Sequence, residues 1–188
     1  MSKLFIFDFF GVLSGEIANR FFLNHYNSDI ALQKKDDFFK PADIGLVTFL
    51  ETVNNISIDA GISKEEIIEE LKKYGTINEE LFKYILKLKK NNHIALLSNA
   101  PKDLHKFLFP QINLNDYFEK IFISGQIGIS KPDLKIYEKC VNSFNQKFEE
   151  IYMIDDNAKN LKDLEKLNIK GILYTTNEEL FKILNKYL

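Results

Sequence analysis

Short apolar runs alternate with amphipathic stretches along most of this chain. The runs are rich in β-branched and aromatic residues, and most of them end in glycine, serine, asparagine or aspartate. This pattern is typical of buried strands that end in tight turns. Five such strands are predicted, in residues 4–13 with the turn at Gly11, 93–98, 120–124, 150–155 and 169–174.

The stretch between the first two predicted strands has a different pattern. It contains no convincing buried strand, and helical periodicity is predicted for residues 17–26, 44–54 and 64–74. Asp43 is expected to cap the second of these helices. Ser63 and Glu66 form the capping-box signature for the third. The pattern therefore predicts a small helical insertion after the first strand.

Beyond residue 75, helices alternate with the remaining strands. They are predicted at residues 79–91, 102–109, 134–144 and 160–167, and from residue 177 to the end. Strands that alternate with helices indicate a parallel sheet covered on both faces. We therefore expect an α/β fold with a Rossmann-like parallel five-stranded sheet. The core would comprise residues 1–13 and 76–188, and residues 14–75 would form the helical insertion.

Composition narrows the class of protein. Of the 188 residues, 45% are apolar and 28% are charged, as in an ordinary soluble globular protein. The net charge of −2 gives no sign of a nucleic-acid or membrane surface, and no apolar run approaches the roughly 18 residues that span a bilayer. The single cysteine, Cys140, excludes an internal disulfide. A cytoplasmic protein is expected, because no basic leader precedes the first strand.

Polar residues of the types found in catalytic and ligand-binding sites lie at the ends of the predicted strands. Asp8, Ser98 and the pair Asp155–Asp156 each follow an apolar run, and Lys131 lies in the loop after another strand. Taken singly, each has an ordinary explanation as a cap, a turn residue or a solvated charge. In open α/β sheets, however, ligands bind outside the carboxyl ends of the strands. We therefore expect these residues to converge on one site.

Four segments together resemble the haloacid dehalogenase-like hydrolase superfamily. They are residues 7–13 (FDFFGVL), 97–99 (LSN), 130–133 (SKPD) and 154–157 (IDDN). The resemblance runs through nearly the whole chain, and the helical insertion falls where this family places a small cap. Within the family, the chain resembles the phosphatase branch, and in particular bacterial sugar-phosphate phosphatases. The family would therefore make residues 14–75 a helical cap.

The resemblance implies a mechanism in which Asp8 attacks phosphorus and forms an aspartyl-phosphate. It also implies a Mg²⁺ cofactor. The metal ligands would be carboxylate oxygens of Asp8, Asp155 and Asp156 and the backbone carbonyl of Phe10. Hard oxygen ligands of this kind suit Mg²⁺.

The resemblance further implies residues that bind the phosphoryl group of a small phosphorylated metabolite. Ser98 would donate a hydrogen bond to that group, and the backbone N–H of Asn99 would line the phosphate pocket. Lys131 would neutralise the charge that develops on Asp8 and the phosphate. The pattern does not specify the substrate or the oligomeric state.

The chain departs from the family pattern at Phe10. Family members that are efficient phosphatases mostly carry an aspartate there, which transfers protons to the leaving group and from water. Such help is worth roughly 10²- to 10⁴-fold. Three hypotheses stay open: a phosphatase that obtains its proton elsewhere, a catalytically weak or inactive binding or regulatory protein, and a 2-haloacid dehalogenase. The last class resembles the chain at Phe10 but lacks the acidic pair of Asp155 and Asp156.

Overall fold

The centre of the molecule is a sheet of five parallel strands in the order β3-β2-β1-β4-β5, seen in a computed structural model that describes residues 2–188. The strands are β1 (Leu4–Phe7), β2 (His93–Ser98), β3 (Lys120–Ile123), β4 (Ile151–Asp155) and β5 (Ile169–Leu173). This confirms the predicted α/β class. The strand β1 lies in the middle, where Phe7 pairs with Leu96 on one side and Ile154 on the other.

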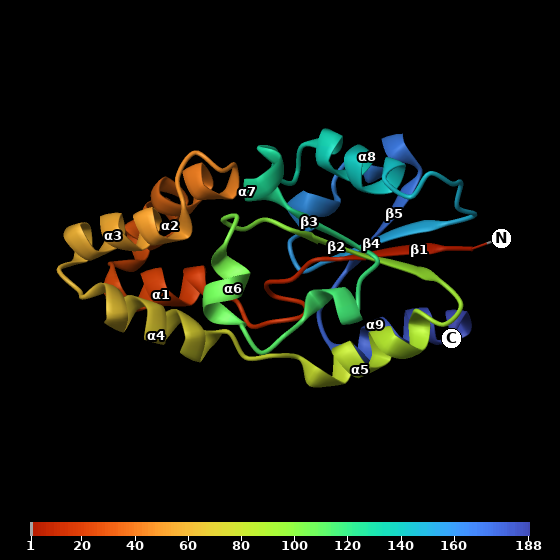
Figure 1. Cartoon of the computed structure of the whole chain (residues 1–188), viewed down its shortest axis with the longest axis horizontal. Helices are drawn as coiled ribbons and strands as arrows, with labels where there is room; N and C mark the ends of the chain where they lie inside the picture. The colour runs from red at the N-terminus through yellow and green to blue at the C-terminus, as the bar shows by residue number, and fades with distance from the viewer. Residues whose placement is uncertain (1) are drawn as a thin grey trace.

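Alternating side chains of β1 bury both faces of the sheet. Phe5 and Phe7 join one apolar cluster, and Leu4 and Ile6 join another on the opposite face. The first cluster is covered by α5 (Glu79–Leu88), α6 (Leu104–Leu108) and α9 (Asn177–Leu184). The second is covered by α8 (Leu134–Asn142) and the short 3₁₀ helices η2 (Ala158–Leu161) and η3 (Leu164–Leu167), so the sheet lies between two helical layers (Figure 1).

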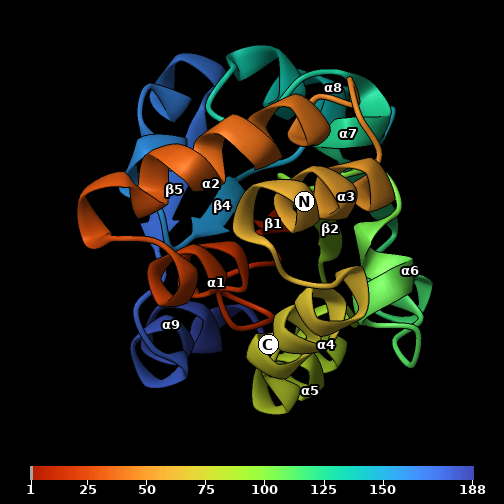
Figure 2. The ribbon, with the colours of Figure 1, turned by 90° about the vertical axis from the view of Figure 1, so that its left-hand side faces the viewer.

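Four further helices form a group beyond the carboxyl ends of the strands. They are α1 (Ala18–His25), α2 (Ser28–Asp43), α3 (Phe49–Ala60) and α4 (Lys64–Tyr74). The strand arrows point toward this group in Figure 1, and Figure 2 looks onto it with the sheet behind. Its interior is aromatic: the rings of Phe22 and Phe39 lie 6.2 Å apart, centroid to centroid. These helices therefore face the end of the sheet at which ligands bind in α/β folds.

The second predicted helix, residues 44–54, is wrong in its boundaries. Asp43 ends α2 and does not cap α3. The cap is Thr48, whose side chain accepts a hydrogen bond from the Glu51 N–H while the Glu51 carboxylate accepts one from the Thr48 N–H. The helix α2 was not predicted, because only Ala31, Phe39 and Ala42 are buried along it and Pro41 occupies its last turn.

Other elements match the expectations more closely. The capping box of Ser63 and Glu66 at the start of α4 is confirmed, and Asn78 caps α5. Residues 160–167 are not one helix, because Lys162 is extended and Asp163 has a left-handed backbone between η2 and η3. The remaining short elements are η1 (Leu114–Asp116), α7 (Ser124–Ile127) and η4 (Asn185–Tyr187). Among residues 2–188, no helix combines the length and apolar character needed to cross a bilayer.

Burial of β1 generates a stability prediction. Phe5 is fully buried and stacks on Tyr152, with ring centroids 5.1 Å apart. We expect Phe5→Ala to lower the free energy of unfolding by about 3–5 kcal/mol, because it leaves a cavity beneath α5 and α9. Ile58→Ala is the control, since that side chain is 76% exposed on α3 and should change stability by less than about 0.5 kcal/mol. Urea denaturation of both variants measures the difference, and equal effects would contradict the prediction.

Candidate active site

A buried lysine joins two aspartates at the carboxyl end of the sheet. The Lys131 Nζ lies 2.8 Å from Asp8 Oδ1 and 2.6 Å from Asp155 Oδ2. Asp8 directly follows β1, Asp155 ends the neighbouring strand β4, and Lys131 lies in the loop before α8. The side chains of Lys131 and Asp155 are completely inaccessible, and that of Asp8 is 10% exposed. Buried charges are very costly unless they are paired, so these three groups depend on one another.

The ionisation of these groups reflects burial and mutual charge. The pKa of Asp8 is raised to about 8. Burial and the Asp155 carboxylate raise it, and Lys131 opposes them. Burial alone would lower the pKa of Lys131, but Asp8 and Asp155 raise it overall, so the lysine stays charged. Burial and Asp155 also raise the pKa of Asp156. The site is therefore a place where negative charge is concentrated around one cation.

The loop after β1 leaves room for a third carboxylate, that of Asp156, which directly follows β4. The carbonyl of Phe9 accepts hydrogen bonds from the N–H groups of Leu13 and Ser14, which folds residues 9–14 into a tight turn. Gly11 has a φ of +80°, and a Cβ atom there would lie 2.2 Å from Asp156 Oδ2. Only glycine therefore allows Asp156 to lie against this turn.

Carboxylate oxygens of Asp8, Asp155 and Asp156 lie within 4.8 Å of one another. The three are not equivalent. Asp155 is fully engaged, because it accepts hydrogen bonds from Asn160 Nδ2 at 3.0 and 3.1 Å and from the Asn157 N–H at 2.9 Å, besides its contact with Lys131. Asp156 is exposed to the adjoining pocket. Such a set of hard oxygen donors is able to hold a divalent cation.

Ser98 and Asn99, at the end of β2, differ in what they contact. The Ser98 Oγ is buried and has no hydrogen-bond partner among residues 2–188. The Asn99 side chain is occupied: its Nδ2 donates to the Lys131 carbonyl at 2.9 Å, and its Oδ1 accepts from the Lys131 N–H at 2.8 Å. Asn99 therefore holds the backbone of Lys131, whereas the buried Ser98 hydroxyl has no partner among these residues.

A pocket of about 850 Å³ lies between the core and the helical group, and Ser98 and Asp155 are not among the residues that line it. Its core side includes Asp8, Phe10, Asn99, Lys131 and Asp156. Its other side includes Glu16, Asn19, Lys35, Asp36, Phe39, Lys40 and Asp43, most of them on α2. Arg20 does not line it; this guanidinium is exposed and lies 5.4 Å from the centroid of the Tyr74 ring.

The position of Phe10 carries no group that transfers protons. Its ring lines the pocket and packs on Phe9 and His105, with centroid distances of 5.0 and 5.6 Å. Both ring nitrogens of His105 are buried and have no partner among the described residues. Burial lowers the pKa of His105 to about 4, so the imidazole is neutral and packs as an aromatic ring.

Sequence reasoning missed two kinds of residue around this site. Asn160 holds Asp155, and its own carbonyl accepts a hydrogen bond from the Tyr137 hydroxyl at 2.6 Å. A buried asparagine five residues after Asp155 was the available signal. Asp43 and Glu16 reach the pocket from the helical group, and no spacing in the sequence relates them to Asp8.

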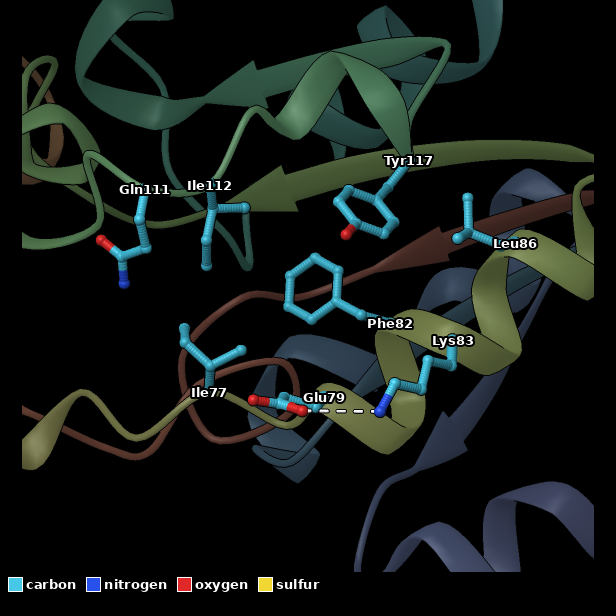
Figure 3. A pocket seen from close by; sticks show the side chains of 8 residues that line it. All are labelled: Ile77, Glu79, Phe82, Lys83, Leu86, Gln111, Ile112 and Tyr117. Atoms are coloured by element: carbon cyan, nitrogen blue, oxygen red, sulfur yellow. Dashed lines mark hydrogen bonds and ion pairs between the residues drawn. The ribbon is translucent and has the colours of Figure 1, made fainter.

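A second pocket, of about 320 Å³, lies against α5 on the surface of the core (Figure 3). Its walls are largely apolar and include Phe82, Ile112 and Tyr117. Among the residues that the structure describes, the only charged pair beside this pocket is Glu79 and Lys83, whose charged atoms lie 3.5 Å apart. It contains none of the residues joined by Lys131, so the larger pocket is the candidate active site.

Two curated relatives resemble part of the chain. A glyceraldehyde 3-phosphate phosphatase from Pyrococcus furiosus is 36% identical over 77 residues, which are 39% of this chain and 31% of that protein. A D-ribitol-5-phosphate phosphatase from Bacteroides thetaiotaomicron is 32% identical over 84 residues, 42% of this chain and 41% of that protein. The chain thus spans less than half the length of the curated relatives it matches.

The fold also resembles solved structures along its whole length. A haloacid dehalogenase family enzyme from Bacteroides thetaiotaomicron, crystallised with magnesium and inorganic phosphate, gives a TM-score of 0.79 at 24% identity. The alignment covers 96% of this chain and all of that one. At this identity the likeness concerns the fold.

The model of the haloacid dehalogenase-like hydrolase family matches residues 2–167 of this chain. The match includes the end of β1, the end of β2, Lys131 and the Asp155–Asp156 pair. The chain therefore belongs to the haloacid dehalogenase-like hydrolase family.

Proposed function

We propose that this chain is a Mg²⁺-dependent phosphomonoester hydrolase that acts on a small phosphorylated metabolite. Asp8 is the nucleophile and becomes an aspartyl-phosphate. The observation that carries the proposal is the contact of Lys131 with both Asp8 and Asp155 beside the large pocket. The lysine holds a carboxylate ready at a place where a transferred phosphoryl group also needs positive charge.

The roles proposed for Asp8 and Ser98 follow from which of their side-chain oxygens have no hydrogen-bond partner. Asp8 Oδ1 accepts from the Phe9 N–H at 2.7 Å and contacts Lys131, whereas no hydrogen bond to Oδ2 is found within residues 2–188. That oxygen is the one to attack phosphorus. The unpartnered Ser98 hydroxyl donates to a phosphoryl oxygen, and the Asn99 backbone N–H lines the same phosphate pocket.

The residues present fit Mg²⁺. Carboxylate oxygens of Asp8, Asp155 and Asp156 lie close together, with no histidine or cysteine in the described cluster. Together with the Phe10 carbonyl, these are hard oxygen donors of the kind that Mg²⁺ prefers. When bound, Mg²⁺ screens the repulsion between the Asp8 carboxylate and the phosphate dianion. Asp156 is the more accessible member of the acidic pair, and Asp155 positions Lys131.

Residues 14–75 are proposed to act as a cap on the core formed by residues 1–13 and 76–188. The support is that α1–α4 stand at the carboxyl end of the sheet (Figure 2). Residues of α2 also line the pocket that Asp8 lines. A cap in this place excludes water and contacts the part of the substrate that leaves. The names of the two curated relatives, both phosphatases of small phosphorylated compounds, support the substrate class.

The first prediction from this proposal concerns the nucleophile. Wild-type protein is expected to hydrolyse p-nitrophenyl phosphate with Mg²⁺ and to lose this activity in EDTA. Asp8→Asn should reduce turnover by roughly 10⁴-fold or more, because the amide does not attack phosphorus. The rate of p-nitrophenol release measures both effects, and circular dichroism checks that the variant folds.

Other results of the same assay separate the competing hypotheses. Chloride release from 2-chloropropionate without metal would replace the phosphatase with a dehalogenase. No turnover of p-nitrophenyl phosphate or of a panel of phosphorylated metabolites, with Mg²⁺ binding still detected by calorimetry, would indicate a binding or regulatory protein.

The second prediction concerns the buried ion pairs. Lys131→Met should lower the free energy of unfolding by about 3–5 kcal/mol in EDTA, because it leaves Asp8 and Asp155 facing each other without a cation. Lys159→Met is the matched control, since this lysine lines the same pocket but is exposed. Urea denaturation should show a change of less than about 0.5 kcal/mol for the control. A similarly small change for Lys131→Met would contradict the proposed dependence.

A further inference from the structure

Hydrolysis of a phosphate ester requires two proton transfers that the core residues around Asp8 do not supply. The leaving oxygen must gain a proton, and the attacking water must lose one. Phe10 has no titratable group, Lys131 is committed to two carboxylates, and His105 is buried away from the pocket lining. A proton carrier on the other wall of the pocket, formed by the helical group, would supply both transfers.

Asp43 is the carboxylate of that wall that has no other task. It ends α2 and lines the pocket shared by Asp8, Phe10 and Lys131. No hydrogen bond or ion pair of its carboxylate is found within residues 2–188. The neighbouring carboxylates are engaged. Asp36 lies 2.6 Å from Lys35 and 2.8 Å from Lys40, and Glu16 accepts from the Asn19 N–H at 3.3 Å.

The backbone around Asp43 is held against the core. Gly45 has a φ of +76°, and a Cβ atom there would lie 2.4 Å from the carbonyl oxygen of Gly125. A Cβ atom on Gly125 would lie 2.9 Å from the Ala42 carbonyl oxygen, and the Gly125 N–H donates to the Ala100 carbonyl at 3.1 Å. The end of α2 thus contacts α7, whose Gly125 is hydrogen-bonded to Ala100, two residues after the end of β2. This contact holds the end of α2, and with it the pocket-lining Asp43, against the core.

The charge environment of Asp43 suits a group that both gives and takes protons. Burial raises the pKa of Asp43 to about 7; Lys35 lowers it, Asp36 and Glu16 raise it, and Lys131 lowers it. These four are the charged groups that act on it from α2, from the segment before α1 and from the core. Both protonation states are then populated near neutral pH, where general acid–base groups work best.

We propose that Asp43 transfers the protons of the reaction in place of the residue at position 10; this inference rests on the proposed phosphatase activity. In the first step, Asp8 Oδ2 forms a bond to phosphorus while the bond from phosphorus to the leaving oxygen breaks. That oxygen takes the proton of the Asp43 carboxyl, so an alcohol leaves and Asp43 becomes a carboxylate.

In the second step, a water oxygen forms a bond to phosphorus while the bond from phosphorus to Asp8 breaks. Asp43 takes a proton from this water and regains its starting state. Inorganic phosphate is released, and Asp8 is again a carboxylate. The residue is therefore an acid in one half of the reaction and a base in the other.

The test compares Asp43→Asn with wild type in Mg²⁺, using p-nitrophenyl phosphate. This substrate releases an acidic phenol, so the first step does not need the Asp43 proton, whereas the second step still needs a base. Asp43→Asn should give a rapid burst of p-nitrophenol, about one per enzyme, followed by steady turnover that is ~10²- to 10⁴-fold slower than wild type. Acid quenching should show phosphorylated protein accumulating in the variant.

The pH dependence gives a second readout. Wild-type steady turnover of p-nitrophenyl phosphate should rise as the pH passes upward through about 7, because only the Asp43 carboxylate takes the proton from water. The rise should be absent in Asp43→Asn and present again in Asp43→Glu. Asp37→Asn is the matched control: Asp37 is exposed on the same helix, accepts from Gln33 Nε2 at 2.7 Å and does not line the pocket, so its turnover should be unchanged.

Wild-type turnover in Asp43→Asn would overturn the proposal. Loss of the burst together with steady turnover in a folded variant would also overturn it, in favour of a substrate-binding role. If Asp43→Asn does not fold, Asp43→Glu and the wild-type pH profile decide, and a flat profile overturns the proposal. If the wild-type protein releases no p-nitrophenol at all, the proposed phosphatase activity itself is contradicted. That outcome differs from every result that overturns the role of Asp43 alone, because those results require an active wild-type protein.

Discussion

The ammonium group of Lys131 is the interaction on which the site depends. It lies within ion-pair distance of Asp8 and Asp155, and the side chains of Lys131 and Asp155 are inaccessible to solvent. Two buried carboxylates on neighbouring strands repel each other, and a low-dielectric environment increases that cost. The positive charge of Lys131 compensates both carboxylates. Asn99 holds the backbone of Lys131, and Asn160 donates to both carboxylate oxygens of Asp155. The residues that directly follow β1 and β2, the last residue of β4, the loop before α8 and η2 are thereby joined into one unit.

This unit forms the charged side of the large pocket, and the helical group formed by α1–α4 lines its other side. The aromatic packing of Phe9, Phe10 and His105 makes the region around position 10 apolar and free of proton carriers. In the proposed mechanism, the proton transfers therefore draw on Asp43 of α2. The close backbone contact between Gly45 and Gly125 ties α2 to the core at the point where Asp43 enters the pocket. In the proposed mechanism, Asp8 of the core attacks phosphorus and Lys131 stabilises the developing negative charge. Asp43 of the helical group transfers the protons.

The strands and their end residues were predictable from the sequence for a simple physical reason. A strand buried on both faces must be apolar at nearly every position, so a polar residue at its end, such as Asp8 or Asp155, stands out. The helix α2 was not predictable, because its buried residues are few and small apart from Phe39, and Pro41 suggested a break. The roles of Asn99, Asn160 and Asp43 depend on contacts between segments far apart in the chain, which periodicity does not reveal.

The most direct measurement is the identification of the residue that carries the phosphoryl group during turnover. The protein is mixed with p-nitrophenyl phosphate and Mg²⁺, quenched in acid within the first turnover, digested and examined by mass spectrometry. A phosphoryl group on the peptide that contains Asp8, localised to that residue and absent from the Asp8→Asn variant, is the expected result. Release of phosphate with no phosphorylated protein at any time, or a phosphoryl group on another residue, would contradict Asp8 as the nucleophile.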